Sequence, residues 1–254
     1  MRRYVLLAMA FLVLLPVPGW GAEYLHVISM VAPPRVMLID GEVTGMAADL
    51  VKEGLTRAGY QFDIELVPWK RALYMIQSGT ADALFYPIFT KERTEYFHYS
   101  PTPLFRIGLA ALKRADSDIV IRPDFGGLDH LVLGIGLGFQ YGPKGKEFME
   151  KAHFVKIEAT SSNNLGFLKL LDGRIDLLLM DSTLATHYLK QRSTLGKVDF
   201  ARDEQGRIAI LDYREGYLVF SRKTATAVDA ANFSKALDSM IRDGTYDDIV
   251  NRYK

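Results

Sequence analysis

The sequence predicts a mixed α/β fold with two α/β units in one chain. Residues 61–66 alternate polar and apolar side chains, which is the pattern of a strand with one buried face. The flanking segments, residues 46–58 and 69–76, carry apolar side chains at helical spacing, and Gly59 and Gly79 follow them as helix stops. Strands and helices that alternate in this way predict a mostly parallel sheet covered by helices.

A second series of the same kind follows in the second half of the chain. Its expected strands and helices, in chain order, cover residues 131–135, 143–152, 154–157, 162–171 and 175–180. The last expected elements are a strand at 217–220 and helices at 225–242 and 246–252. No flexible linker separates the two units, so we expect ordered strands near residues 109–113 and 211–216 to join them as a hinge.

These segments divide the chain into two lobes. We predict that lobe 1 consists of residues 23–111 and 217–254, and that lobe 2 consists of residues 112–216. Of the 254 residues, 49% are hydrophobic, which is enough apolar material for one large domain or two small ones.

Residues 1–22 have the features of a signal peptide. Two arginines precede an apolar run at residues 4–15, which is too short to span a bilayer comfortably. Prolines and glycines then interrupt this run before a cleavage site near Gly21 or Ala22. An uncleaved membrane anchor is the less favoured alternative, so we expect an exported protein located in the periplasm.

Charge and cysteine content exclude several classes of function. The chain has 31 Lys and Arg against 30 Asp and Glu, and charges of both signs alternate along it, which argues against a nucleic-acid partner. It has no cysteine, so a thiolate nucleophile, a disulfide and a cysteine-based zinc site are all excluded.

No catalytic, metal or cofactor motif is present in the sequence. The five histidines show no metal-ligand spacing, and there is no GxSxG nucleophile elbow. The glycine-rich segment 136–142 is one residue too long for the GxGxxG pattern of dinucleotide-binding proteins. We therefore predict no catalytic residue, no metal and no cofactor.

Seven short motifs occur in a fixed order: GEVTGMAADLV from Gly41, VPWKRAL from Val67, SGTADAL from Ser78, TKER from Thr90, FHYSP from Phe97, LDGRIDLLLMD from Leu171 and DGTYDDIVNRY from Asp243. Together they resemble the extracellular solute-binding proteins of family 3, the polar amino acid class that serves ABC importers. The resemblance implies the type 2 periplasmic binding fold, in which each of two lobes is a mostly parallel sheet flanked by helices and two hinge strands join the lobes.

The resemblance also implies a clamp for an amino acid. Arg93, at the end of the Thr-x-x-Arg motif, would bind the α-carboxylate, and Asp181 in the other lobe would bind the α-amino group. The turn at residues 136–142 would present backbone N–H groups to the carboxylate. For Arg93 the alternative is a solvated surface charge, and for Asp181 it is the N-cap of the helix that follows.

An aromatic run, residues 85–89 (FYPIF), precedes Arg93. These bulky side chains stand where the family usually has small or hydroxyl residues, which favours a flat or apolar ligand. Alternation along a buried strand predicts that Phe85 and Phe89 fill the core and that Tyr86 points to the cleft. Trp69 would cover either the cleft or the edge of the core, with the cleft slightly favoured. Asn163 and Asn164 would either face the cleft or cap a helix. The predicted ligand-binding residues are Trp69, Arg71, Tyr86, Arg93, Gly138, Phe139, Tyr141, Asn163, Asn164 and Asp181.

These observations predict a periplasmic solute-binding protein that closes on a small polar solute, an amino acid or a related carboxylate. It would act as a monomer and deliver the solute to an ABC permease. One alternative is a ligand-sensing partner of a membrane receptor, and a less favoured one is an enzyme resembling the cyclohexadienyl dehydratases of this fold, which would need a general acid in the cleft.

Overall fold

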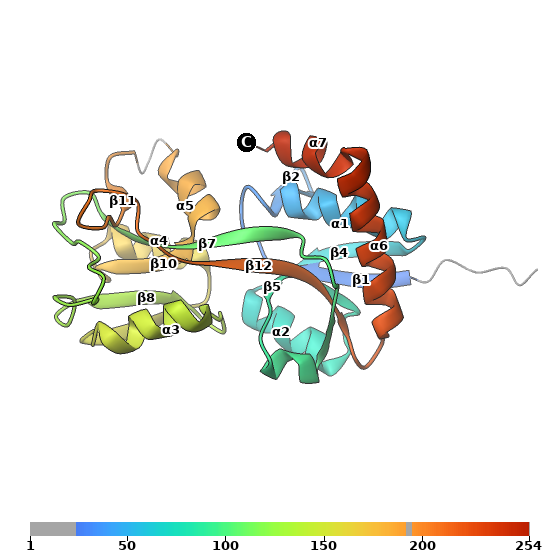
Figure 1. The fold of residues 1–254 in the computed structure, drawn as a ribbon, viewed down its shortest axis with the longest axis horizontal. Coiled ribbons are helices and arrows are strands. Elements are labelled where there is room, and N and C mark those ends of the chain that lie inside the picture. The colour runs from blue at the N-terminus through green and yellow to red at the C-terminus, as the bar shows by residue number, and fades with distance from the viewer. Residues whose placement is uncertain (1–23, 192–194, 254) are drawn as a thin grey trace, which may run out of the picture.

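The computed structural model describes residues 24–191 and 195–253. A ten-stranded mixed sheet runs through two lobes, in the strand order β4-β1-β5-β12-β7-β10-β8-β9, with β11 paired to β7 and β6 paired to β12 (Figure 1). The predicted signal peptide, residues 1–22, lies outside the described residues. Within the described ranges, no helix combines the length and apolar character needed to cross a bilayer.

Lobe 1 contains the N-terminal α/β unit and the two C-terminal helices. Strand β1 pairs in parallel with both β4 and β5, as the alternation of strands and helices predicts. The strands are β1 (Tyr24–Ser29), β2 (Met37–Ile39), β3 (Glu42–Thr44), β4 (Gln61–Leu66), β5 (Ala83–Ile88) and β6 (Phe97–Tyr99). The helices are α1 (Met46–Arg57), α2 (Trp69–Ser78), the short 3-10 helix η1 (Glu92–Glu95), α6 (Ala227–Asp243) and α7 (Thr245–Asn251).

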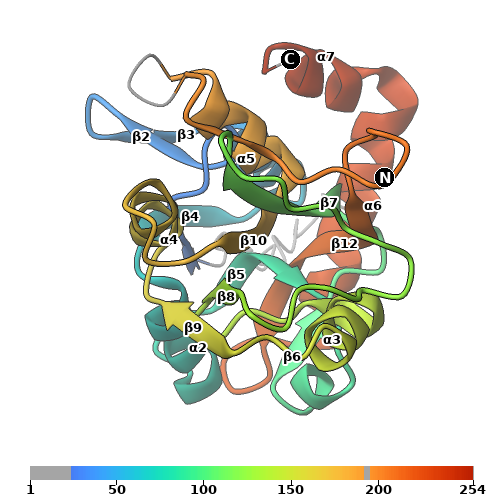
Figure 2. The ribbon, with the colours of Figure 1, turned by 90° about the vertical axis from the view of Figure 1, so that its left-hand side faces the viewer.

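Lobe 2 contains the second α/β unit. Strand β8 pairs in parallel with β9 and β10, and helices cover this part of the sheet (Figure 2). Its strands are β8 (Val132–Gly136), β9 (Lys156–Thr160), β10 (Leu177–Asp181) and β11 (Val198–Phe200). Its helices are α3 (Gly142–Lys151), α4 (Asn163–Leu171) and α5 (Ser182–Leu189).

Two long antiparallel strands, β7 (Phe105–Arg114) and β12 (Ile210–Ser221), run from one lobe to the other (Figure 1). The expected hinge segments, residues 109–113 and 211–216, lie within these strands. Because the two strands are hydrogen-bonded to each other, a change in the angle between the lobes would bend them together.

Local sequence explains the elements that carry the site. Strand β4 and helix α2 match the predicted strand at 61–66 and helix at 69–76, and the left-handed Gly79 ends α2 as predicted. In β10, Leu177 and Leu179 pack into one core cluster, while Leu178 and Met180 pack into another. The strand is therefore buried on both faces, which explains its uninterrupted apolar run.

The prediction for the aromatic strand β5 was right for Phe85 and wrong for Phe89. Phe85 is fully buried in the core of lobe 1, but Phe89 lies just beyond the end of β5 and is 56% exposed. The alternation ends with the strand, because the chain turns there toward η1.

Gly45, which precedes α1, is packed tightly against the loop that carries Arg35. Its φ is +113°, and an added Cβ would lie 2.5 Å from the backbone oxygen of Arg35. Replacing Gly45 by alanine is therefore expected to lower the free energy of unfolding by about 2 kcal/mol, measured by denaturant titration. Gly41 is the matched control, because its φ is +83° but nothing lies within 4 Å of its added Cβ. Equal losses for the two variants would contradict the steric explanation.

Candidate functional site

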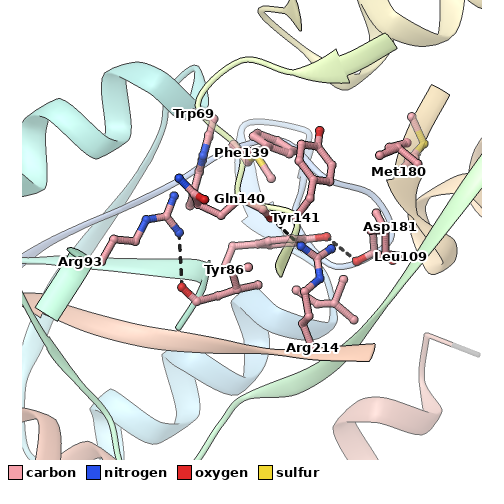
Figure 3. A pocket seen from close by; sticks show the side chains of 14 residues that line it. Trp69, Tyr86, Arg93, Leu109, Phe139, Gln140, Tyr141, Met180, Asp181 and Arg214 are labelled. Atoms are coloured by element: carbon pink, nitrogen blue, oxygen red, sulfur yellow. Dashed lines mark hydrogen bonds between the residues drawn. The ribbon is translucent and has the colours of Figure 1, made fainter. Parts of the chain in front are cut away.

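A cavity with a volume of about 50 Å³ lies between the lobes, beside the crossing strands (Figure 3). Residues of both lobes and of both crossing strands line it, and most of the lining is apolar. The polar or charged side chains of the lining are Tyr86, Arg93, Gln140, Tyr141, Asp181 and Arg214.

Arg93 reaches the cavity from η1 and is only 7% exposed. Its Nη1 donates to the oxygen of Ile88 at 3.3 Å and its Nη2 donates to the oxygen of Gly138 at 3.4 Å. Its guanidinium carbon lies 5.7 Å from the centre of the Trp69 ring. Burial lowers the pKa of Arg93, but a guanidinium remains charged at neutral pH. Among the described residues, no carboxylate oxygen lies within 4.0 Å of the Arg93 nitrogens.

The turn that follows β8 closes the lobe 2 side of the cavity. Gly138 has a φ of +77°, and its oxygen accepts hydrogen bonds from Trp69 Nε1 at 3.2 Å and from Arg93. Phe139 packs edge-to-face on Trp69, with 5.6 Å between the ring centres. The Tyr141 hydroxyl accepts from the Gly136 N–H at 2.6 Å, and burial raises the pKa of Tyr141 to about 12. The turn is therefore in direct contact with lobe 1.

Asp181 ends β10 and is the N-cap of α5, which was the alternative that the sequence left open. Its Oδ1 accepts from the N–H of Thr183 at 2.7 Å and of Leu184 at 3.3 Å. Its Oδ2 faces lobe 1, where it accepts from the Tyr86 hydroxyl at 2.9 Å and from Arg35 Nε at 3.4 Å. The carboxylate thus caps a helix within lobe 2 and also holds lobe 2 to lobe 1 through hydrogen bonds.

Tyr86 lines the cavity, and its side chain crosses it toward Asp181 (Figure 3). Burial first, and then the charge of Asp181, raise the pKa of Tyr86 well above its usual value, so the hydroxyl stays protonated and donates. The backbone at Tyr86 has a φ of 102°, which is strained for a bulky residue. Strain of this kind costs about 1–3 kcal/mol and persists where surrounding contacts enforce it.

The sequence does not predict two arginines of this region, Arg35 and Arg214. Arg35 is 4% exposed, and its Nη2 donates to Thr183 Oγ1 at 2.9 Å in addition to the bond from Nε to Asp181. It also lies over the Phe105 ring, with 4.7 Å from its guanidinium carbon to the ring centre. The only sequence signal for Arg35 is a single charge inside the apolar segment APPRVM.

Arg214 lies on the crossing strand β12. Its Nη1 donates to the oxygen of Gln140 at 2.5 Å, while its Nε is buried and has no hydrogen-bond partner among the described residues. Burial lowers the pKa of Arg214, and the charge of Asp212 partly opposes this. The segment DYREGY, in which charges of both signs occur, carried no signal that would separate Arg214 from a solvated arginine.

Of the remaining predicted site residues, some line the cavity and others do not. Trp69 and Phe139 line both this cavity and a second one of about 320 Å³, which Asn163 also lines. Arg71 and Asn164 are exposed and line neither cavity. The N-cap of α4 is Ser162, whose side chain accepts from the Leu165 N–H, so the capping alternative for the two asparagines was wrong.

The described residues around the inter-lobe cavity include few groups of the kinds used in acid–base or metal chemistry. Over the part of the chain that the structure describes, no three histidine, aspartate or glutamate residues cluster as a metal site. The lining of the inter-lobe cavity contains no histidine, and its one carboxylate, Asp181, is engaged by four donors.

Comparison with known proteins gives one family over nearly the whole chain. Residues 26–254 match the description of bacterial extracellular solute-binding proteins, family 3. No curated protein sequence matches the chain.

Solved structures with this fold include several binding proteins. An ancestral arginine-binding protein bound to arginine matches with a TM-score of 0.77 and 23% identity, over 91% of this chain and 97% of that one. The arginine-, lysine-, histidine-binding protein ArtJ from Geobacillus stearothermophilus matches with a TM-score of 0.75 and 19% identity, over 91% and 95%. The periplasmic domain of BvgS from B. pertussis matches with a TM-score of 0.74 and 21% identity, over 91% of this chain and 42% of that one. At these identities the matches establish the two-lobed α/β fold.

Proposed function

Because this chain belongs to the bacterial extracellular solute-binding proteins of family 3, we propose that it binds a small solute carrying a carboxylate between its lobes. The solute would then pass to a membrane partner. The observation that carries this proposal is Arg93, a buried cation at the cavity that has no ion-pair partner among the described residues. A guanidinium in such a position is suited to bind a carboxylate through two parallel hydrogen bonds.

The cavity in this arrangement is too small for a solute of amino acid size. A volume of about 50 Å³ accommodates only a few water molecules, since each needs at least about 10–15 Å³. The lobes therefore have to separate for a ligand to enter, and the strands β7 and β12 provide the hinge. The contacts of Asp181 with Arg35 and Tyr86, and of Gly138 with Trp69 and Arg93, belong to the closed arrangement.

We assign the protein to the periplasm and to a binding role without catalysis. The family to which it belongs is extracellular, and an ABC importer is the partner that we propose for it. The fold match to the periplasmic domain of BvgS supports a membrane sensor as the second candidate partner. We propose that the protein acts as a monomer.

A thermal-shift panel tests the proposed function. The exported protein, expressed from the full-length sequence, is refolded from denaturant to remove carried-over ligand and is mixed with L-amino acids, small carboxylates, sugars or amines. A bound ligand at 100 times its Kd adds about 2.7 kcal/mol to the stability of the folded state. We expect an upward shift of Tm with at least one carboxylate-bearing compound and none with sugars or amines. A panel in which only sugars or amines raise Tm would refute the carboxylate proposal.

A further inference from the structure

In the closed, ligand-free arrangement, the carboxylate of Asp181 has no capacity left for a ligand amine. A carboxylate has about four lone-pair sites, and Asp181 receives four hydrogen bonds. Two come from the backbone of α5, and two come from Tyr86 and Arg35 in lobe 1. A ligand ammonium would have to displace one of these donors.

Arg35 also supplies the positive charge that an ammonium group would bring. The side chains of Arg35 and Asp181 are 5% and 7% exposed, and 3.4 Å separate Arg35 Nε from Asp181 Oδ2. Bonds to Thr183 Oγ1 and to the backbone oxygen of Arg106 fix the guanidinium in this position. The pair is therefore neutral overall, and a second cation beside it would have no opposing charge.

The remaining charges at the cavity are positive. Arg93 and Arg214 both line it, and no carboxylate oxygen of a described residue comes within 4.0 Å of the nitrogens of either side chain. Asp212 is the acid that most affects the pKa of Arg214, but it forms no ion pair with it within that distance. The buried Nε of Arg214 has no acceptor among the described residues, which is unusual for a buried polar atom and suits a site for an anion.

Apart from Gln140 and the hydroxyls of Tyr86 and Tyr141, the rest of the lining is apolar. Met30, Ile88, Ile107, Leu109, Leu179 and Met180 form it together with the aromatic rings. Polar groups beyond a carboxylate would find few partners on these walls, and burying a polar group without a hydrogen bond is unfavourable.

On the basis of the proposed function, we propose that the ligand is a small carboxylic acid with an apolar or aromatic body and no amino group. In a cleft wider than this ligand-free one, its carboxylate binds Arg93 and lies in the positive field of Arg214, while its body contacts the apolar walls. Arg35 takes the place beside Asp181 that the ammonium group of an amino acid would otherwise occupy.

Matched pairs of compounds test this proposal. Each pair consists of an L-amino acid and the same acid without its amino group: phenylalanine and 3-phenylpropanoate, leucine and 4-methylpentanoate, and norvaline and pentanoate. Isothermal titration of the refolded protein is expected to give at least tenfold tighter binding for the acid in the best-bound pair. Tighter binding of the amino acid would overturn this inference and leave the proposed function intact. No binding by either member of any pair, with no shift in the wider carboxylate panel, would overturn both.

The variant Arg35→Met supplies a second test. It removes the cation beside Asp181, so the ratio of amino acid affinity to acid affinity is expected to rise at least tenfold. Arg222→Met is the control, because Arg222 is an exposed arginine of lobe 1 that donates to the oxygen of Thr94 outside the cavity. An Arg35→Met protein with the wild-type ratio would contradict the role given to Arg35. If this variant does not fold, the comparison of matched pairs on the wild-type protein still decides the proposal.

Discussion

Replacing Arg93 by methionine is expected to weaken binding of the best-bound carboxylate by at least about 2 kcal/mol, or roughly 30-fold in Kd. The substitution keeps an apolar stem against Trp69 but removes the charge and the donors that face the cavity. Isothermal titration measures the change. Arg93→Lys is expected to recover only part of the affinity, because an ammonium group is a point charge without the forked geometry of a guanidinium.

The control for this prediction is Arg71→Met. Arg71 lies on α2 in the same lobe, but it is exposed and does not line the cavity. Its replacement is expected to leave the Kd unchanged, although the sequence predicts that Arg71 binds the ligand. An unchanged Kd in Arg93→Met, or a large loss in Arg71→Met, would show that the ligand binds elsewhere in the cleft.

Replacing Asp181 by alanine is expected to open the two lobes of the ligand-free protein. Breaking a buried ion pair by removing one partner costs about 3–5 kcal/mol when the other charge stays buried. Here Arg35 can escape that cost, because separation of the lobes returns it to water. We therefore expect a larger radius of gyration by small-angle X-ray scattering and a longer distance between spin labels placed on α1 and α4.

Asp181→Asn separates the two roles of the carboxylate. Asparagine is a good N-cap through its one side-chain oxygen. Its NH2 group then takes the Oδ2 position, where it accepts no hydrogen bond from Tyr86 or Arg35 and carries no negative charge for Arg35. The asparagine variant is expected to open as the alanine variant does. Only the alanine variant is expected to lose a further ~1 kcal/mol of stability from the uncapped α5, seen by denaturant titration. Closed lobes in both variants would refute the bonding role of Asp181 between the lobes.

Much of the fold could be predicted because the signals for it are local. The strand at 61–66 and the helix that begins at Trp69 each follow from a repeat in burial that is visible in a short window of sequence. The boundaries were less accurate where a strand is short: the segment expected at 154–157 is β9 at Lys156–Thr160. The prediction that Phe89 fills the core was wrong for a related reason, since alternation holds only while the strand continues.

The candidate site was predictable in part. Motif order predicted Arg93 and Asp181, strand alternation predicted Tyr86, and all three line the inter-lobe cavity. Arg35 and Arg214 carry no local pattern that distinguishes them from surface arginines. Their burial arises from contacts with the other lobe and from the crossing strand.

The sequence by itself determined the α/β class, the order of those helices and strands that show a clear periodicity, and the positions of an arginine and an aspartate that could serve a ligand. These depend on periodicity and on short motifs, and both signals lie within a few consecutive residues. Only the tertiary structure decided which charges meet. Arg35 and Asp181 are separated by 146 positions in the chain, and their contact exists because the hinge strands bring the two lobes face to face. In sequence, a charged residue that pairs with another residue looks the same as one that pairs with a ligand, because each appears only as a single charged position. The packing of the lobes settles which partner each charge has.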